Sequence, residues 1–243
     1  TYQWKIAGIN HQAWLLEISR DGKDLYPEIK ARAAARTEKH NDMVRYEIMK
    51  RFGYYVTESS EHNAEYMPYF IKDKYPELIE RFNIPLDEYP RRCVNQIEKW
   101  TQMRKDLVEK HDLTHERSKE YASHIMEAME TNQPYKFGGN VLNTGLIPNL
   151  PAEAAVEVPC LVDKSGVQPV YVGNLPPQCA AMNRTNINVQ FLTIEAALTG
   201  KKDYIYQAAM MDPHTASELS IDDIVAMCDD LIEAHGDWMP KFH

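Results

Sequence analysis

Apolar residues recur in this sequence at two different intervals, and the two patterns occupy different segments. At the start, Tyr2, Trp4 and Ile6 alternate with polar residues, as in a strand with one buried face. The strands that this alternation predicts cover residues 2–9, 14–19, 156–162 and 167–172. A turn sequence at 163–166 joins the last two, so we expect an antiparallel hairpin there.

Elsewhere apolar residues recur every three or four positions, as they do on one face of a helix. The helices that this spacing predicts cover residues 41–52, 90–108, 118–129, 188–199, 203–211 and 221–235. Residues 54–70 have no clean period and should form a loop or short helix, and 110–117 should form a connection. We therefore expect a helix-rich α+β fold, with antiparallel strands, as one domain over residues 1–243.

Three of the predicted helices carry further expectations. Cys93, Ile97, Trp100, Met103 and Leu107 share one face of 90–108, and Ala122, Ile125, Met126 and Met129 should point inward from 118–129. Asn186 or Asn188 fits the N-cap of the helix at 188–199, because a short polar side chain can bond the free N–H groups of a first turn. Ser220 should cap the last helix, and Gly236 should end it.

Charge, hydropathy and cysteine spacing exclude several classes of partner. The net charge is −9 without a basic block, which argues against nucleic acid. No apolar run approaches the roughly 18 residues of a membrane span. The four cysteines form no CxxC pair and indicate reduced thiols in a cytoplasmic protein. Because Thr1 is not an initiator Met and the first residues already fit a strand, we expect the chain to be part of a longer protein.

Polar residues gather in four segments where chemistry could occur. His11 follows a mostly apolar strand and could bind a divalent ion or be a hydrogen-bonded core histidine. Residues 57–62 combine carboxylates and hydroxyls beside tyrosines, which suits a sugar or a solvated loop. The asparagines and Glu157 within 140–157 fit turn geometry as well as a ligand site, and the polar run 183–190 fits a helix cap. The pair Gly138–Gly139 lacks the G-x-G-x-x-G spacing of a dinucleotide fold.

These segments occur together, and in this order, in a known family. Ala7 to His11 and Phe52 to His62 resemble the bacterial α-galactosidases of glycoside hydrolase family four. The same resemblance extends over residues 88–93, 149–151, 156–158, 185–190, 211–215 and 229–238, and so over essentially the whole chain. It implies the C-terminal domain of a lactate-dehydrogenase-like glycosidase, whose N-terminal Rossmann domain is absent from this chain.

The resemblance also implies an activity and its cofactors. Bound NAD would oxidise the sugar at C3, a base would remove the C2 proton, and the aglycone would leave by elimination. A divalent ion, usually Mn²⁺, would polarise the C2 and C3 oxygens. The expected substrates are α-galactosides of the melibiose and raffinose type. The alternatives are a non-catalytic sugar-binding fragment and a family member that acts on α-glucosides or α-galacturonides.

Site residues and partners follow from the same resemblance. His11 matches the metal-binding histidine, while a cysteine ligand and the NAD loop belong to a segment upstream of Thr1. Tyr54 ranks first and Glu61 second as the general base. The expected sugar contacts are Asn10, Glu58, Ser60, His62 and Asn143, and the expected cofactor contacts are Asn149 and Arg184. We expect a homodimer or tetramer that is inactive without the N-terminal half of the enzyme.

Overall fold

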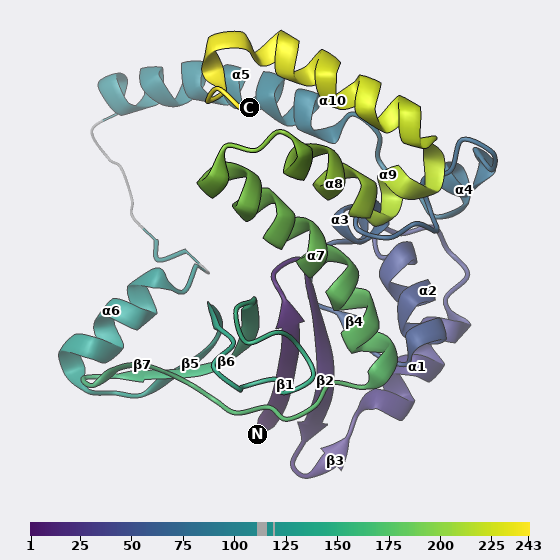
Figure 1. The fold of residues 1–243 in the computed structure, drawn as a ribbon. Coiled ribbons are helices and arrows are strands. Elements are labelled where there is room, and N and C mark those ends of the chain that lie inside the picture. Colours follow the sequence, from purple (N-terminus) through teal and green to yellow (C-terminus); the bar gives the residue numbers. More distant parts are fainter. Residues whose placement is uncertain (111–115, 119) are drawn as a thin grey trace.

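A computed structural model describes residues 1–110, 116–118 and 120–243 and shows an antiparallel sheet of two hairpins surrounded by helices (Figure 1). The strands are β1 (Tyr2–Ile9), β2 (Gln12–Arg20), β3 (Lys23–Asp24), β4 (Tyr55–Val56), β5 (Tyr135–Leu142), β6 (Ala155–Asp163) and β7 (Gly166–Pro169). Their order is β3-β2-β1-β6-β5, with β4 paired to β2 and β7 to β6. The hairpins β1–β2 and β5–β6 meet at the bridge between Gly8 and Glu157.

Helices make up most of the remaining described chain. They are α1 (Tyr26–Ala35), α2 (Met43–Phe52), α3 (Ser60–Glu65), α4 (Glu77–Arg81), α5 (Glu88–Glu109), α6 (Ala122–Thr131), α7 (Pro177–Thr199), α8 (Asp203–Met211), α9 (Pro213–Glu218) and α10 (Ile221–His235), followed by the 3₁₀ turn Gly236–Trp238. The predicted helix-rich α+β class is confirmed. Sequence reasoning missed the helices α1, α4 and α9 and the strands β3, β4 and β5.

The predicted ends of two helices agree with the structure. Gly53 ends α2 with φ of 88°, a left-handed conformation that glycine adopts without steric cost. Ser220 caps α10, because its side chain accepts a hydrogen bond from the backbone N–H of Asp223. Gly236 follows the last residue of α10, as expected.

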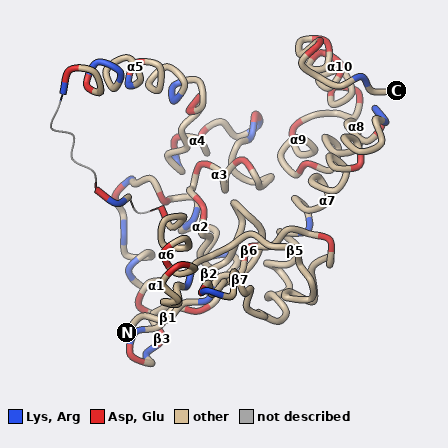
Figure 2. The backbone as a smooth tube through the Cα atoms, turned by 90° about the vertical axis from the view of Figure 1, so that its left-hand side faces the viewer, with Lys and Arg blue, Asp and Glu red and all other residues tan. Residues whose placement is uncertain are grey.

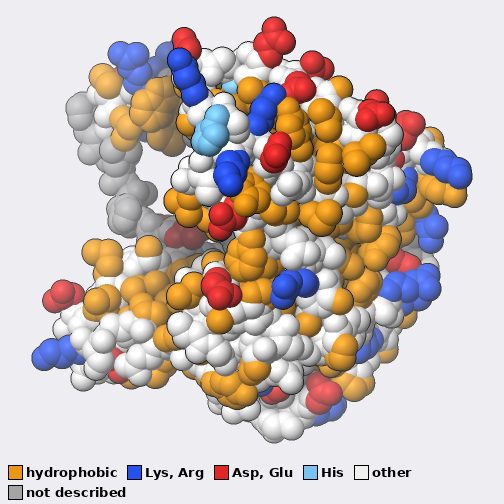
Figure 3. All heavy atoms as spheres, viewed as in Figure 1, with side chains coloured by type: hydrophobic (Ala, Val, Ile, Leu, Met, Phe, Trp, Pro, Cys, Tyr) orange, Lys and Arg blue, Asp and Glu red, His pale blue; other side chains and the backbone are white. Residues whose placement is uncertain are grey.

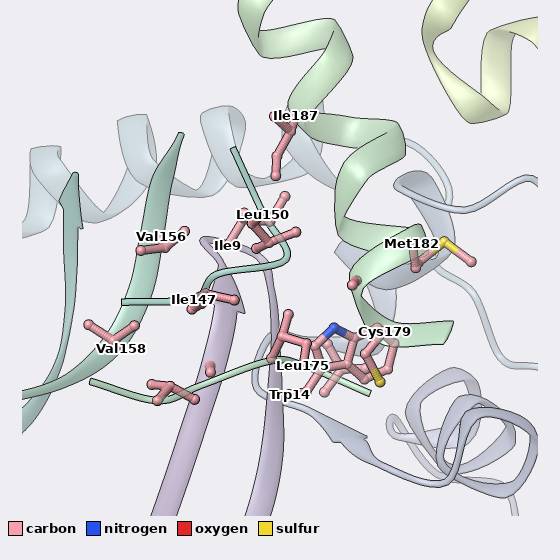
Figure 4. Close-up of a cluster of buried hydrophobic side chains, with 14 of the residues drawn as sticks. Ile9, Trp14, Ile147, Leu150, Val156, Val158, Leu175, Cys179, Met182 and Ile187 are labelled. Atoms are coloured by element: carbon pink, nitrogen blue, oxygen red, sulfur yellow. The ribbon is translucent and has the colours of Figure 1, made fainter. Parts of the chain in front are cut away.

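The core lies between the sheet and α7. Trp14, Ile9 and Val158 on the strands are fully buried, and α7 contributes Cys179 and Ile187 from its inward face (Figure 4). Burial of these large apolar side chains supplies roughly 1.5–3 kcal/mol each, so this cluster fixes α7 against the β1–β2 hairpin. The helix therefore has a defined position over the turn between β1 and β2.

The start of α7 corrects a prediction. The helix begins at Pro177, eleven residues before the expected position, so Asn186 and Asn188 lie inside it and cap nothing. Asn186 is buried rather than solvated. In the sequence, the polar run 183–190 is typical of a helix end. In the structure its buried asparagines need hydrogen-bond partners, and a distant segment of the chain supplies them.

Helices α5 and α6 depart from expectation in burial. No residue of α5 is buried, and Trp100 is 57% exposed on the predicted apolar face. On α6, Met126 and Met129 are exposed, so their predicted inward orientation is wrong; Ala128 is the buried residue. The helix begins at Ala122, and the predicted connection 110–117 falls largely on residues outside the described part of the chain.

Three further properties bear on possible partners. Within the described residues, no helix is long and apolar enough to cross a membrane. Along the described chain, Lys and Arg are interspersed with Asp and Glu (Figure 2). All four cysteines are free thiols, and three of them, Cys160, Cys179 and Cys228, are buried.

Candidate metal and sugar site

The site begins at the tight turn between β1 and β2. Ile9 pairs with Gln12, so Asn10 and His11 form a two-residue turn. His11 has φ of 65°, a left-handed conformation that costs a residue other than glycine about 1–2 kcal/mol. The Asn10 Oδ1 atom accepts a hydrogen bond from the His11 backbone N–H at 3.0 Å. The turn therefore presents the His11 side chain at the end of the sheet.

Pairing of β4 with β2 brings Glu58 to this turn. The backbone N–H of Thr57 donates to the carbonyl of Ala13 at 2.9 Å, which extends the β2–β4 ladder by one residue. Glu58 follows directly, and its Oε2 lies 2.6 Å from His11 Nδ1. Two residues that are 47 positions apart are thus joined by one hydrogen bond.

The charge state of Glu58 fixes the proton on His11. Burial raises the pKa of Glu58, but hydrogen bonds from the Ser59 N–H and from His11 outweigh burial and lower it overall. The carboxylate is therefore ionised and can only accept hydrogen bonds. It follows that His11 Nδ1 carries a proton and that, in the neutral imidazole, the lone pair is on Nε2.

His62 repeats this arrangement from α3. Ser59 caps that helix by accepting from the backbone N–H of His62 at 3.3 Å. The His62 ring lies edge-on to His11, with the ring centres 4.9 Å apart, and its Nδ1 lies 2.9 Å from Glu65 Oε2. The two imidazole rings are thus in contact, and the Nδ1 atom of each lies within hydrogen-bond distance of a carboxylate.

These residues form a group that could hold a metal ion. Donor atoms of His11, Glu58 and His62 all lie within 4.8 Å of one another. Ligands of a common first-row ion lie about 2.0–2.2 Å from it, and so up to roughly 4.4 Å apart. A small side-chain movement would bring the donors onto one ion. Imidazole nitrogens held by carboxylates are the usual arrangement of metal-binding histidines.

Tyr66 extends the site toward α7 and was not among the predicted site residues. Its ring stacks on His11 with 5.9 Å between the centres, and burial raises its pKa, as do the charges of Glu65, Glu58 and Asp212. A hollow of about 340 Å³ begins at Tyr66 and is also lined by Glu65, Asn186, Val189, Gln190 and Asp212. Because Tyr66 follows His62 by four positions, helical spacing would have placed both side chains on one face.

The structure places the two predicted bases away from His11. Tyr54 packs edge-on against Tyr26 at 6.1 Å and contacts the hydrophobic core. Glu61 pairs with Arg92 at 3.4 Å and lines a different hollow, which it shares with Ser60. The Ser60 hydroxyl is buried and accepts from the backbone N–H of Arg45 at 3.2 Å. None of their hydrogen bonds or ring contacts among the described residues involves His11.

The two asparagines predicted to contact a ligand, Asn143 and Asn149, bond to the backbone of loops instead. The Asn143 amide nitrogen donates to three backbone carbonyls and its oxygen accepts from the Ile147 N–H at 2.8 Å. The Asn149 side chain both donates to and accepts from the backbone of Leu175. A ligand would have to break these bonds. Arg184 is exposed on α7, and its guanidinium bonds to Asn188 at 3.2 Å.

Glu157 is a second carboxyl group with an unusual environment. It lies on β6 and pairs with Gly8 of β1, and Gly8 precedes His11 by three residues. Burial and the charge of Glu58 raise its pKa to about 7. Among the described residues it has neither a hydrogen-bond partner nor an ion pair for its side chain. A half-buried carboxyl without a partner is destabilising, and such groups are enriched at functional sites.

Comparison with known proteins gives one consistent result. The Family 4 glycosyl hydrolase C-terminal domain matches residues 6–215. An α-galactosidase of Bacillus subtilis (strain 168) is 66% identical over 239 residues, which are 98% of this chain and 55% of that protein. The chain therefore spans just over half the length of this relative.

Solved structures agree at the level of the fold. One match is lplD, a candidate glucosidase from Bacillus subtilis, with a TM-score of 0.82 and 22% identity over 95% of this chain and 55% of that one. Another is a 6-phospho-α-glucosidase from gut microorganisms in complex with NAD and Mn²⁺. Its TM-score is 0.71 at 20% identity, over all of this chain and 57% of that one.

Proposed function

The chain belongs to the family 4 glycosyl hydrolases, and we propose that it is the C-terminal, substrate- and metal-binding part of an NAD- and Mn²⁺-dependent α-galactosidase. The proposal of galactose as the sugar rests on the 66% identity to a Bacillus subtilis α-galactosidase. Mn²⁺ and NAD are proposed because a structural relative holds both. The cytoplasm remains the predicted compartment.

The observation that carries this proposal is the paired arrangement of His11 and His62. Each imidazole is held through Nδ1 by a carboxylate, so the Nε2 atom of each ring is the proposed ligand of a divalent ion. When bound, Mn²⁺ supplies Lewis acidity at the sugar oxygens, and NAD supplies oxidation and reduction at C3. Nitrogen ligands with few carboxylates bind Mn²⁺ weakly and leave coordination positions open to the sugar.

The residues of this chain bind and orient the sugar. Tyr66 offers a ring face for the C–H surface of a hexose, and Glu65 and Asp212 offer acceptors for hydroxyl groups in the adjoining hollow. Asn10 lies beside His11 at the mouth of the site. Arg184 remains the proposed contact of this chain to a cofactor phosphate, because its guanidinium is exposed. Tyr54 and Glu61 remain the proposed bases.

A hydrolysis assay tests the proposal. The full-length protein, comprising this chain and the segment that precedes it, should hydrolyse p-nitrophenyl α-galactoside only with both NAD and Mn²⁺ present. The chain of residues 1–243 alone should show no hydrolysis, since no dinucleotide-binding fold exists in its described part. The α-glucoside and the α-galacturonide serve as matched substrates. Preference for either one would overturn the galactose assignment, and sugar binding without hydrolysis would favour the non-catalytic alternative.

The proposed homo-oligomer has a structural counterpart in α5. Val94, Ile97, Trp100, Met103 and Leu107 form an apolar face along this helix, and all five are more than half exposed. Leu198 on α7 and Leu231 on α10 are also more than half exposed. Hydrophobic side chains are spread over the face of the molecule that Figure 3 shows. Monomeric proteins rarely expose extended apolar faces, which commonly mark interfaces. We propose that a second copy of the chain covers the face on α5.

A charge on this face should disrupt the assembly. We expect Trp100→Glu to convert the dimer or tetramer into a monomer, as measured by light scattering after size exclusion. A buried unpaired carboxylate at an interface costs several kcal/mol, which exceeds what a modest interface provides. Asn95→Glu, at an exposed position on the opposite side of the same helix, should leave the mass unchanged. A wild-type monomer, or an unchanged mass for Trp100→Glu, would refute this surface.

A further inference from the structure

A buried cluster of amide side chains lies directly behind the turn that carries His11. Its members are Gln12, Asn63, Asn183 and Asn186, all of them at most 4% exposed. They come from three segments: the start of β2, α3 and the middle of α7. Burying four carboxamides is unfavourable unless they bond to one another or to backbone, so their position in the core needs a reason.

Asn183 makes the central contacts of this cluster. Its Nδ2 donates to the carbonyl of Gln12 at 2.6 Å, and its Oδ1 accepts from the indole N–H of Trp14 at 3.1 Å. Both partners follow His11 within three residues. Asn183 thus fixes the backbone on the far side of the turn from a position 172 residues along the chain.

The strand before the turn lies too close to Asn183 for a side chain to fit between them. A side chain at Gly8 would place its Cβ 3.1 Å from Asn183 Oδ1 and 2.5 Å from the carbonyl oxygen of Gln12. Gly8 therefore allows a close approach that any other residue would block. The turn is held between this glycine on β1 and Asn183 on α7.

The same cluster reaches the other side chains of the site. Asn63 Nδ2 lies 3.5 Å from the carbonyl oxygen of His11, and Asn63 follows His62 directly. Asn186 Nδ2 donates to Gln12 Oε1 at 3.1 Å and lies 3.4 Å from the carbonyl of Tyr66. The amides thereby connect the three backbone segments that carry His11, His62 and Tyr66.

We propose that Asn183 is a positioning residue, which holds the strained turn so that the His11 ring meets Glu58 through Nδ1. The left-handed backbone of His11 costs free energy and would relax without a clamp. Relaxation would rotate the imidazole away from Glu58, so the proton would no longer be fixed on Nδ1. The metal-related part of this inference rests on the proposed function, whereas the ring orientation does not.

The test compares Asn183→Leu with a variant that should lower the melting temperature by a similar amount. Leucine is close in volume but leaves the Gln12 carbonyl and the Trp14 indole N–H without partners. Ile187→Ala removes a fully buried side chain one turn further along α7 and should lower the melting temperature by a similar amount. The readout is the ¹⁵N NMR shifts of the His11 ring in the metal-free full-length protein, which report the protonated nitrogen.

We expect the wild type and Ile187→Ala to show His11 protonated at Nδ1, and Asn183→Leu to show a mixture of both tautomers. Mn²⁺ affinity should fall about 10-fold in Asn183→Leu and stay within about twofold in Ile187→Ala, since residues that orient a ligand contribute roughly 10- to 100-fold. An unchanged tautomer in a folded Asn183→Leu would overturn the proposal.

A milder variant covers the case in which Asn183→Leu does not fold. Trp14→Phe keeps a smaller aromatic ring in the core and removes the N–H from which Asn183 accepts. The bond from Asn183 to the Gln12 carbonyl remains, so this variant should give a smaller share of the second tautomer. A pure Nδ1 tautomer in this variant would contradict the clamp. Failure of the wild type to bind Mn²⁺ would instead refute the metal site, while the tautomer comparison would still decide the role of Asn183.

Discussion

Replacing His11 by alanine is expected to weaken Mn²⁺ binding by more than about 100-fold, as measured by titration calorimetry on the protein. The reason is that His11 supplies an imidazole whose Nε2 is left free by the bond from Nδ1 to Glu58. Residues that merely orient a ligand already contribute roughly 10- to 100-fold to metal affinity, so loss of the ligand itself should exceed that range. Hydrolysis by the full-length protein should be lost in parallel.

Two further variants distinguish the loss of the imidazole from the effects of backbone strain and of the carboxylate on Nδ1. His11→Gly removes the same imidazole but suits the left-handed φ of 65°, so it should be about 1 kcal/mol more stable than His11→Ala while also losing the metal. Glu58→Gln keeps the ligand and removes only the carboxylate on Nδ1, so its affinity should fall about 10- to 100-fold. Wild-type Mn²⁺ affinity in His11→Ala would show that the ion binds elsewhere.

Periodicity predicted the elements of the fold better than it predicted which faces are buried. The strand at 2–9 and the helices that end at Phe52 and His235 follow from local patterns and match the structure. The faces of α5 and α6 do not, because spacing shows that one face is apolar but not what covers it. Local sequence carries no information about a partner that is outside the described chain.

The candidate site could be predicted only in part, because local sequence does not reveal contacts between distant residues. The resemblance singled out His11, Glu58 and His62, and the structure brings their donor atoms together. Tyr66 could have been found from its spacing to His62. By contrast, the buried role of Asn183 depends on Gln12 and Trp14, more than 160 residues earlier, and no local pattern reveals such a contact. Tyr54 and Glu61 remain proposed bases that lie away from His11.

Glu157→Gln is expected to stabilise the protein above pH 7 and to leave it nearly unchanged near pH 4.5. The folded protein holds the pKa of Glu157 at about 7, against an ordinary value of 4.5, because burial and Glu58 disfavour the charged form. The folded state thus binds this proton more tightly than the unfolded chain. The stability that the protonated Glu157 side chain contributes is fully present below about pH 4.5 and is lost as the pH rises through about 7.

The size of the effect follows from the same pKa. Each pKa unit represents about 1.4 kcal/mol, so ionised Glu157 destabilises the fold by about 2–3 kcal/mol at pH 8, allowing for its remaining contact with water. Glutamine has the same shape without a charge. The variant should therefore melt about 5–10 °C higher than the wild type at pH 8, with chelator present, and about equally at pH 4.5.

An exposed carboxylate provides the control for this comparison. Glu153→Gln removes the same charge from the loop before β6 and should leave the melting temperature within about 1 °C of the wild type, because surface substitutions rarely exceed ±0.5 kcal/mol. Equal melting of Glu157→Gln and wild type at pH 8 would mean that Glu157 is already well solvated. If the stabilisation is observed, the natural carboxyl is retained at a cost in stability, as expected for a group that serves the site beside Glu58.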